Sequence, residues 1–115
     1  QKPEELEFIE CREDSGQVIK SAEYRVKGSL SSKTERFFIE HYGMNKLKFE
    51  CCGWEPEHGK LGHVKNKKLK RINPDYHMTI SMYGSAEVYK PDTLYLEMDR
   101  NKIDYFYVTV QILEI

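Results

Sequence analysis

The seven cysteine and histidine side chains of this 115-residue chain could act as nucleophiles, metal ligands or redox partners. They are the cysteines Cys11, Cys51 and Cys52 and the histidines His41, His58, His63 and His77. Two of the cysteines are adjacent and stand before a glycine and the only tryptophan, in the stretch F-E-C-C-G-W-E-P at 49–56. Such a stretch could be a metal site, a redox site or a structural clasp.

A metal site is the first chemistry that this spacing suggests. Cys52, His58 and His63 have five and four residues between them, and His41 or Cys51 would complete a tetrahedron around zinc. Zinc motifs usually present two close pairs such as C-x-x-C, whereas adjacent cysteines of a strand point to opposite faces. The alternative is that His58 and His63 are solvated loop residues. We therefore expect no cofactor.

Cysteine catalysis is the second chemistry, and it requires a thiolate beside a histidine. Cys52 is the candidate nucleophile, with His58, His63 or His77 as the candidate base. The chain lacks C-x-x-C, G-x-x-x-x-G-K, G-x-S-x-G and H-E-x-x-H, so the usual signatures of thiol oxidoreductases, phosphate-loop enzymes, serine hydrolases and zincin proteases are missing. We favour a protein that is not an enzyme.

A disulfide is the third reading of the cysteines. Alternation along a predicted strand over 45–52 turns Cys51 toward the core and Cys52 away from it. A bridge from Cys11 to Cys51 then requires neighbouring strands with Cα atoms within about 7 Å, and a register error of one residue would substitute Cys52. Buried free thiols are the alternative.

The elements that would position these residues begin with a β-hairpin. Residues 6–12 and 18–28 are predicted strands, and Ser15-Gly16 between them suits a tight turn. With a two-residue turn, Cys11 stands opposite Lys20 and faces the core.

One helix is predicted after this hairpin. Ser32 and Glu35 have the spacing of a capping box, and Gly43 stands where a helix would end. Its apolar stripe comprises Thr34, Phe37, Phe38, His41 and Tyr42. This helix is expected to cover the apolar face of the sheet.

The remaining chain reads as further strands and one long loop. Periodicity disappears over 53–74, a candidate functional loop, and returns at 76–83 and 103–113. Residues 93–98 read as a strand, with one helical turn as the alternative. The order β-β-α-β-β-β predicts an α+β fold, in which an antiparallel sheet of about five or six strands carries one main helix on one face. The length predicts a single domain over 1–115.

Aromatic residues mark a candidate interaction surface. Tyr83, Tyr105 and Tyr107 alternate with core positions of their strands and should share the outer sheet face. Trp54 is expected to cover the edge of the core, with a role as a binding platform as the alternative. Exposed tyrosines of this kind would contact a protein, a peptide or a glycan.

Charge and hydropathy exclude two classes of partner. The 18 Lys and Arg residues nearly balance the 19 Asp and Glu residues, which removes the signature of a dedicated nucleic-acid binder. The run K-N-K-K-L-K-R at 65–71 could hold phosphate groups, but no aromatic interleaving accompanies it, and a solvated loop is the alternative. The longest apolar runs fall far short of the ~20 residues of a membrane span, so no transmembrane segment is expected.

Several stretches together resemble a family of small, uncharacterised bacterial proteins that are exported or lipoprotein-like. They are E-F-I-E-C, A-E-Y-R-V-K-G, H-Y-G-M-N-K-L-K-F-E-C-C-G-W-E, I-S-M-Y and Y-F-Y-V-T-V, and C-C-G-W-E is the most specific of them. The resemblance covers nearly the whole chain and brings no activity. It implies an extracytoplasmic setting, periplasmic or membrane-anchored. The segment missing before Gln1 would then be an export signal, and a lipid anchor would fit there.

These observations lead to two hypotheses from different classes. The favoured one is a non-enzymatic, extracytoplasmic binding domain that uses the outer aromatic face or the 53–74 loop. The alternative is a cysteine- or metal-dependent protein centred on Cys52 and the loop histidines. The connectivity and exposure of the three cysteines would discriminate between them.

Overall fold

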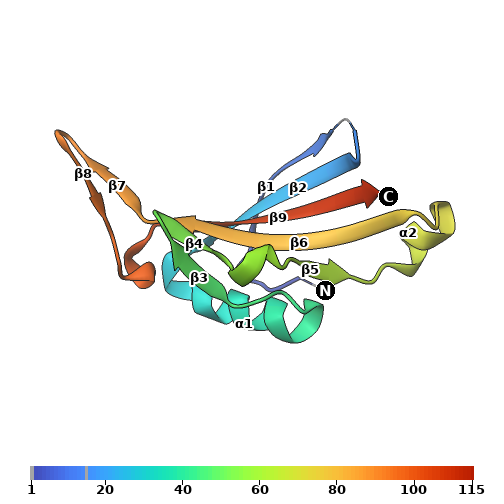
Figure 1. Cartoon of the computed structure of the whole chain (residues 1–115), viewed down its shortest axis with the longest axis horizontal. Helices are drawn as coiled ribbons and strands as arrows, with labels where there is room; N and C mark the ends of the chain where they lie inside the picture. Colours follow the sequence, from blue (N-terminus) through green and yellow to red (C-terminus); the bar gives the residue numbers. More distant parts are fainter. Residues whose placement is uncertain (1, 15) are drawn as a thin grey trace.

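A computed structural model of the chain describes residues 2–14 and 16–115. Its main element is a seven-stranded antiparallel sheet with one long helix on one face, and a two-stranded hairpin projects from one end (Figure 1). The predicted α+β fold is confirmed, although the main sheet has seven strands rather than five or six. No helix in the described residues is long and apolar enough to cross a membrane.

The main sheet has the strand order β1-β2-β9-β6-β4-β3, and β5 pairs with β6 beside this path. Its strands are β1 (Glu7–Glu13), β2 (Val18–Lys27), β3 (Leu47–Glu50), β4 (Gly53–Pro56), β5 (Gly62–Val64), β6 (Tyr76–Ser85) and β9 (Tyr105–Glu114). The projecting hairpin consists of β7 (Glu87–Lys90) and β8 (Thr93–Leu96), so the strand prediction for 93–98 is confirmed for its first four residues. The helices are α1 (Ser31–Tyr42) and α2 (Lys67–Ile72), with short 3-10 turns η1 (Gly28–Leu30), η2 (Glu57–Gly59) and η3 (Arg100–Lys102).

The start of α1 differs from the predicted capping box. Leu30 is the N-cap residue, no side chain caps the helix, and Ser32 lies inside it. Glu35 instead accepts a hydrogen bond from the backbone N–H of Leu47 and pairs with Arg100, because β3 and η3 approach this side of the helix. The end is as predicted, since Gly43 adopts the left-handed conformation that favours glycine at this position.

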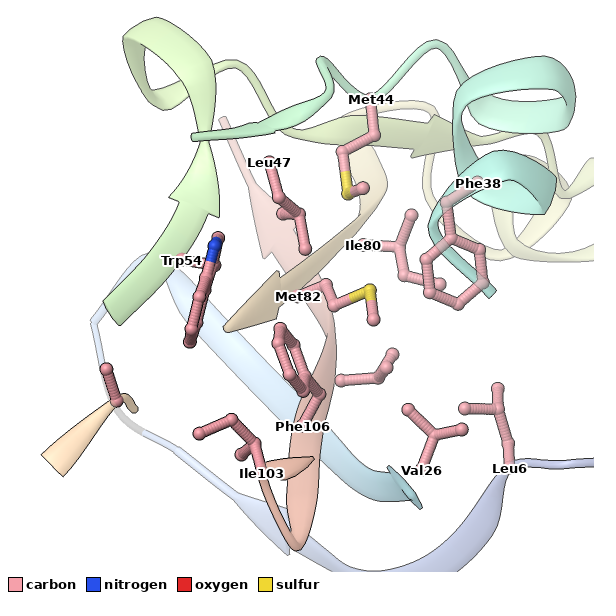
Figure 2. Close-up of a cluster of buried hydrophobic side chains, with 12 residues drawn as sticks. Leu6, Val26, Phe38, Met44, Leu47, Trp54, Ile80, Met82, Ile103 and Phe106 are labelled. Carbon is pink, nitrogen blue, oxygen red and sulfur yellow. The ribbon is translucent and has the colours of Figure 1, made fainter. Parts of the chain in front are cut away.

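The core lies between α1 and the sheet (Figure 2). Alternate residues of β6 and β9 point into it, so that Ile80, Met82, Phe106 and Val108 are all buried. Phe38 of α1 is fully buried against them. Burial of such a side chain contributes about 2 to 3 kcal/mol, which is the main reason that the helix stays on the sheet.

The segment 53–74 is not the irregular loop that the sequence predicts. It contains β4, η2, β5 and α2, elements of three to six residues that are too short to produce a visible period. Pro56 lies within a paired strand, opposite Leu47 in the ladder of β3 and β4. It is tolerated there because β6 pairs only with Gly53 and Trp54, leaving no strand on that side of Pro56 to receive an N–H.

The first hairpin has a register two residues away from the predicted one. Cys11 stands opposite Ala22 rather than Lys20, because Glu13 and Lys20 form the last pair and six residues separate them. The predicted Ser15-Gly16 turn falls partly outside the described residues. Cys11 is free and exposed, since β1 is an edge strand whose residues are all exposed.

Candidate functional site

Tyr83, Tyr105 and Tyr107, three of the four candidate binding aromatics, lie on the sheet face opposite α1. Tyr83 on β6 stands opposite Tyr107 on β9, Tyr107 stands opposite Arg25 on β2, and Arg25 stands opposite Glu7 on β1. Directly paired residues share a face, so these four side chains form one continuous line across four strands, here called the tyrosine row. Tyr83 and Tyr107 expose 46% and 42% of their surface.

Arg25 is fixed within the tyrosine row by two contacts. Its Nε donates a hydrogen bond of 2.8 Å to Oε1 of Glu7, and this bond is the main reason that the pKa of Arg25 is raised. Its guanidinium carbon lies 4.0 Å from the ring centroid of Tyr105, the next outer residue of β9. The cation therefore has a defined position beside the tyrosines, which lowers the entropy cost of binding through it.

The tyrosine row continues into the cysteine hairpin through Tyr83. The phenol Oη of Tyr83 lies 2.8 Å from the point where a Cβ on Gly53 would stand. A Cβ at position 53 would come even closer to the backbone carbonyl oxygen of Gly84, so the glycine of C-C-G-W is what lets β4 lie this close to Tyr83 and Gly84 of β6. The glycine thus serves the close packing of β4 against β6.

The two adjacent cysteines form the turn that joins β3 to β4, where Glu50 pairs with Gly53. Cys51 and Cys52 are bonded to each other in a disulfide. Cys51 is exposed and has φ of 56°, and the N–H of Cys52 donates to the carbonyl of Glu50 at 2.5 Å, which closes a γ-turn. The carbonyl of Cys52 accepts from the N–H of Ala86 at 2.7 Å, which fastens the turn to the end of β6.

The predicted bridge from Cys11 to Cys51 or Cys52 is not formed. The strands β1 and β3 are the two opposite edges of the sheet, with β2, β9, β6 and β4 between them. The prediction also assumed that alternation extends through both cysteines, but β3 ends at Glu50. The inward and outward assignments of Cys51 and Cys52 therefore do not apply.

The candidate metal ligands and bases are not brought together. Cys52 has no free thiol, His58 lies exposed in η2, and His63 lies exposed on β5. Within residues 2–14 and 16–115 there is no group of three or more His, Cys, Asp or Glu residues arranged to hold a metal ion. No observation in the described residues favours the cysteine- or metal-dependent alternative.

Trp54 is a core residue, as the favoured reading predicted, and it takes no part in the tyrosine row. It is 8% exposed. Its ring packs edge-on against Phe49, with ring centroids 5.2 Å apart, and lies tilted against Phe106, with ring centroids 5.7 Å apart. Figure 2 shows it at one side of the buried cluster, across from Phe38. The binding role considered for Trp54 is therefore not available to it.

The helix α2 and the cavity beside it are not predicted from the sequence, because the run 65–71 has the composition of a solvated loop. Lys65 and Asn66 connect β5 to α2, and the other five residues of the run form most of α2. Asn66 is the N-cap residue, whose side-chain Oδ1 accepts the N–H of Leu69 at 3.0 Å. Asn66 followed by K-K-L-K-R-I is a helix N-cap signal that could have revealed this helix. A cavity of about 540 Å³ lies between α2, the end of β5 and the start of β6.

Comparison with known proteins gives one match. Residues 1–54 match the model of a family described as a domain of unknown function, DUF4952. No curated protein and no solved structure matches the chain. The matched segment ends inside β4 and includes β1, β2, α1, β3 and the cysteine turn. It supports the resemblance to an uncharacterised family, while the exported and bacterial character of that family stays a prediction for this chain.

Proposed function

We propose that this protein is a non-enzymatic binding domain whose tyrosine row contacts a protein partner. The observation that carries the proposal is the placement of two exposed tyrosines side by side, next to an arginine already held by Glu7 and Tyr105. Tyrosine and arginine are enriched at the energetically dominant positions of protein interfaces. Ordered residues of this kind bind with a small loss of conformational freedom.

The row favours a protein surface over a peptide or a glycan. Its four residues span four neighbouring strands at right angles to the chain direction, which gives a broad contact area. Five cavities in the described residues have linings that include neither Tyr83 nor Tyr107. A broad surface without a deep pocket suits a folded partner, and glycan binding is treated below as a competing outcome.

We place this binding function outside the cytoplasm, on the basis of the family resemblance. The Cys51–Cys52 disulfide is compatible with that setting, because disulfides persist in oxidising compartments. Fractionation of cells that express the natural gene, followed by detection of the protein in the periplasmic, membrane and cytoplasmic fractions, tests this. Recovery in the cytoplasm alone would contradict it.

Site-specific photo-crosslinking in the natural host tests the binding surface. A photoreactive aromatic residue replaces Tyr107 in one variant and Tyr89 in the matched control, since Tyr89 is a more exposed tyrosine, at 74%, on the separate β7–β8 hairpin. We expect a covalent adduct of one defined mass at position 107 and none at position 89.

Two results would overturn the proposal. Equal adducts at both positions would show that crosslinking reports exposure only. Binding of isolated glycans that is lost in Tyr83→Ser and Tyr107→Ser, without any protein adduct, would replace the protein partner by a carbohydrate.

A further inference from the structure

The cavity beside α2 is distinct from the tyrosine row and combines two kinds of lining. The apolar part comes from Val64, Leu69, Tyr76 and Met78, on three different elements. At about 540 Å³ the cavity falls within the range of roughly 300 to 1,000 Å³ that small-molecule sites occupy. An apolar group of a ligand would be removed from water here.

The other part of the lining is cationic. Lys65, Lys67, Lys70 and Arg71 all line the cavity. In the described part of the chain, none of them lies within 4.0 Å of a carboxylate, whereas Arg12, Arg25 and Arg100 each have such a partner. These four cations therefore have no carboxylate in direct contact, which leaves them available to an anion.

One of these cations is already oriented by the fold. Nζ of Lys70 donates to the carbonyl of Pro74 at 3.0 Å and lies 3.3 Å from Nδ1 of His77. No such contact constrains the side chains of Lys67 and Arg71 in the described residues, so they are the ones that can be changed without loss of a structural hydrogen bond.

The apolar lining continues from this cavity toward the core. Val64 and Met78 also line a smaller cavity of about 200 Å³, which reaches Leu6, Phe38 and Val108 between α1 and the sheet. A hydrocarbon chain that enters beside α2 would thus have further apolar surface ahead of it. Figure 1 shows α2 at the far end of the sheet from the β7–β8 hairpin. The strand β5 and the C-terminal end of α1 lie toward that same end.

We propose that the cavity beside α2 binds an amphipathic anion, a single hydrocarbon chain with a carboxylate or phosphate head. The head would lie against Lys67 and Arg71, and the chain would lie against Val64, Leu69 and Met78. The charge complementarity selects the anionic head, and the continuous apolar lining selects the hydrocarbon tail over a small inorganic anion. This site is independent of the proposed function of the tyrosine row.

Calorimetric titration of the full-length protein with monomeric alkyl phosphates tests the site. Octyl, decyl and dodecyl phosphate are used below their micelle concentrations. Affinity should rise by up to about sixteenfold for each two added carbons, since each methylene that is fully removed from water strengthens binding about fourfold. Alkyl trimethylammonium ions of the same lengths should bind at least tenfold more weakly.

Charge variants locate the binding. In the double variant Lys67→Gln and Arg71→Gln we expect affinity for dodecyl phosphate to fall at least tenfold. The matched control, Lys46→Gln and Lys60→Gln, removes two exposed lysines elsewhere and should bind like the unchanged protein. Nitrogen-15 NMR spectra should show ligand-induced shifts concentrated in residues 63–78, and Tyr107→Ser should leave the affinity unchanged.

Each remaining outcome overturns the proposal. Equal affinity for cationic and anionic amphiphiles would indicate nonspecific apolar adsorption. Inorganic phosphate that binds as tightly as dodecyl phosphate would make this a simple anion site. Binding to phosphatidylglycerol vesicles, with no binding of monomers, would make α2 a membrane-surface contact instead of a pocket.

Discussion

Cys51 and Cys52 show at the scale of single residues how local geometry decides chemistry. Sequence alternation assigned them to opposite faces of a strand, but the strand ends at Glu50, two residues earlier than predicted, and the pair makes the turn. Once both are in the turn, they are each other's nearest sulfur partners. The stretch C-C-G-W is therefore a clasp at the end of the sheet, which is the structural reading of the motif.

The first prediction concerns the stability that this disulfide contributes. In the chain-entropy model a closed loop of two residues lowers the entropy of the unfolded chain by an amount worth only about 1 kcal/mol, against about 4 kcal/mol for the 40-residue loop of a Cys11–Cys51 bridge. Cys51→Ser with Cys52→Ser should thus lower the free energy of unfolding by about 1 kcal/mol, as measured by urea denaturation. A loss of 3 kcal/mol or more would argue for the longer bridge, and Cys11→Ser is the control that should have little effect.

The second prediction concerns the pKa of Glu5, whose carboxylate attaches the N-terminal segment to α1. Burial by itself raises this pKa. The hydroxyl of Thr34, which donates at 2.7 Å, the backbone N–H of Glu5 and the cation of Lys33 outweigh burial, so the pKa is lowered below its ordinary 4.5. Because the folded pKa is depressed, this stabilisation is present above pH 4.5 and is lost as the pH falls through the folded value.

Thr34→Val tests this assignment. It removes the main hydrogen bond but keeps the volume at a fully buried position, so the pKa of Glu5 should rise toward or above its ordinary value. Carboxyl carbon NMR titration of Glu5 measures the change, with the exposed Glu40 of α1 as the internal control. An unchanged titration of Glu5 would show that Thr34 does not stabilise the carboxylate.

At the scale of elements, Glu35 does not form the predicted cap of α1. Its carboxylate instead connects α1 to η3 and to β3. Its Oε1 accepts from Nη1 of Arg100 in η3 at 2.7 Å, and its Oε2 accepts the N–H of Leu47 in β3 at 2.7 Å. Both charged side chains are mostly buried, at 20% and 12% exposure. One carboxylate therefore links α1 to parts of the chain that are 12 and 65 residues away.

The third prediction follows from this connection. Glu35→Gln leaves the largely buried guanidinium of Arg100 without its counter-charge, and hydrogen bonds to charged groups contribute about 2 kcal/mol each. The free energy of unfolding should thus fall by about 2 kcal/mol in chemical denaturation. Glu40→Gln, on the exposed side of the same helix, should change it by less than 0.5 kcal/mol. Equal effects of the two changes would show that the pairing has no special role.

The elements were predictable from sequence where they are long or bounded by a strong signal. The strands β2, β6 and β9 have ten residues each and clear alternation, and α1 ends at a glycine. The short strands and the 3-10 turn of 53–74 were not predictable, because at most two periods fit within each of them, whereas α2 had a missed signal in its N-cap Asn66. The register of the first hairpin was also missed, since it depends on the length of its loop rather than on the pattern of its strands.

At the scale of the whole molecule, the order of the sheet makes the two halves of the chain depend on each other. The N-terminal strands β1 and β2 and the later pair β3 and β4 lie on opposite sides of β9 and β6. The central strands thus come from the C-terminal half, with Phe106 and Val108 fully buried. The family match, which ends at residue 54, therefore covers a part of the chain that encloses no core of its own.

The fourth prediction is that the fragment 1–54 does not fold alone. Without β6 and β9, the apolar side of β2 and the buried face of α1 have no partner, and a two-stranded hairpin is marginal in water. Its proton–nitrogen NMR spectrum should lack dispersion, and its thermal transition should not be cooperative, in contrast to the full chain. A dispersed spectrum of the monomeric fragment would show that residues 1–54 fold without β6 and β9, which contradicts the prediction.

The sequence by itself determined the α+β class, the long strands, the main helix, the burial of Trp54 and the common outer face of Tyr83, Tyr105 and Tyr107. These features follow from periodicity and local geometry, which residues a few positions apart specify. Only the tertiary structure decided which strands are neighbours, and with that the pairing of Cys51 with Cys52, the exposure of Cys11, the line from Tyr83 to Glu7 and the cavity beside α2. Strand order and register depend on contacts between distant residues, whose energies no local pattern in the sequence displays.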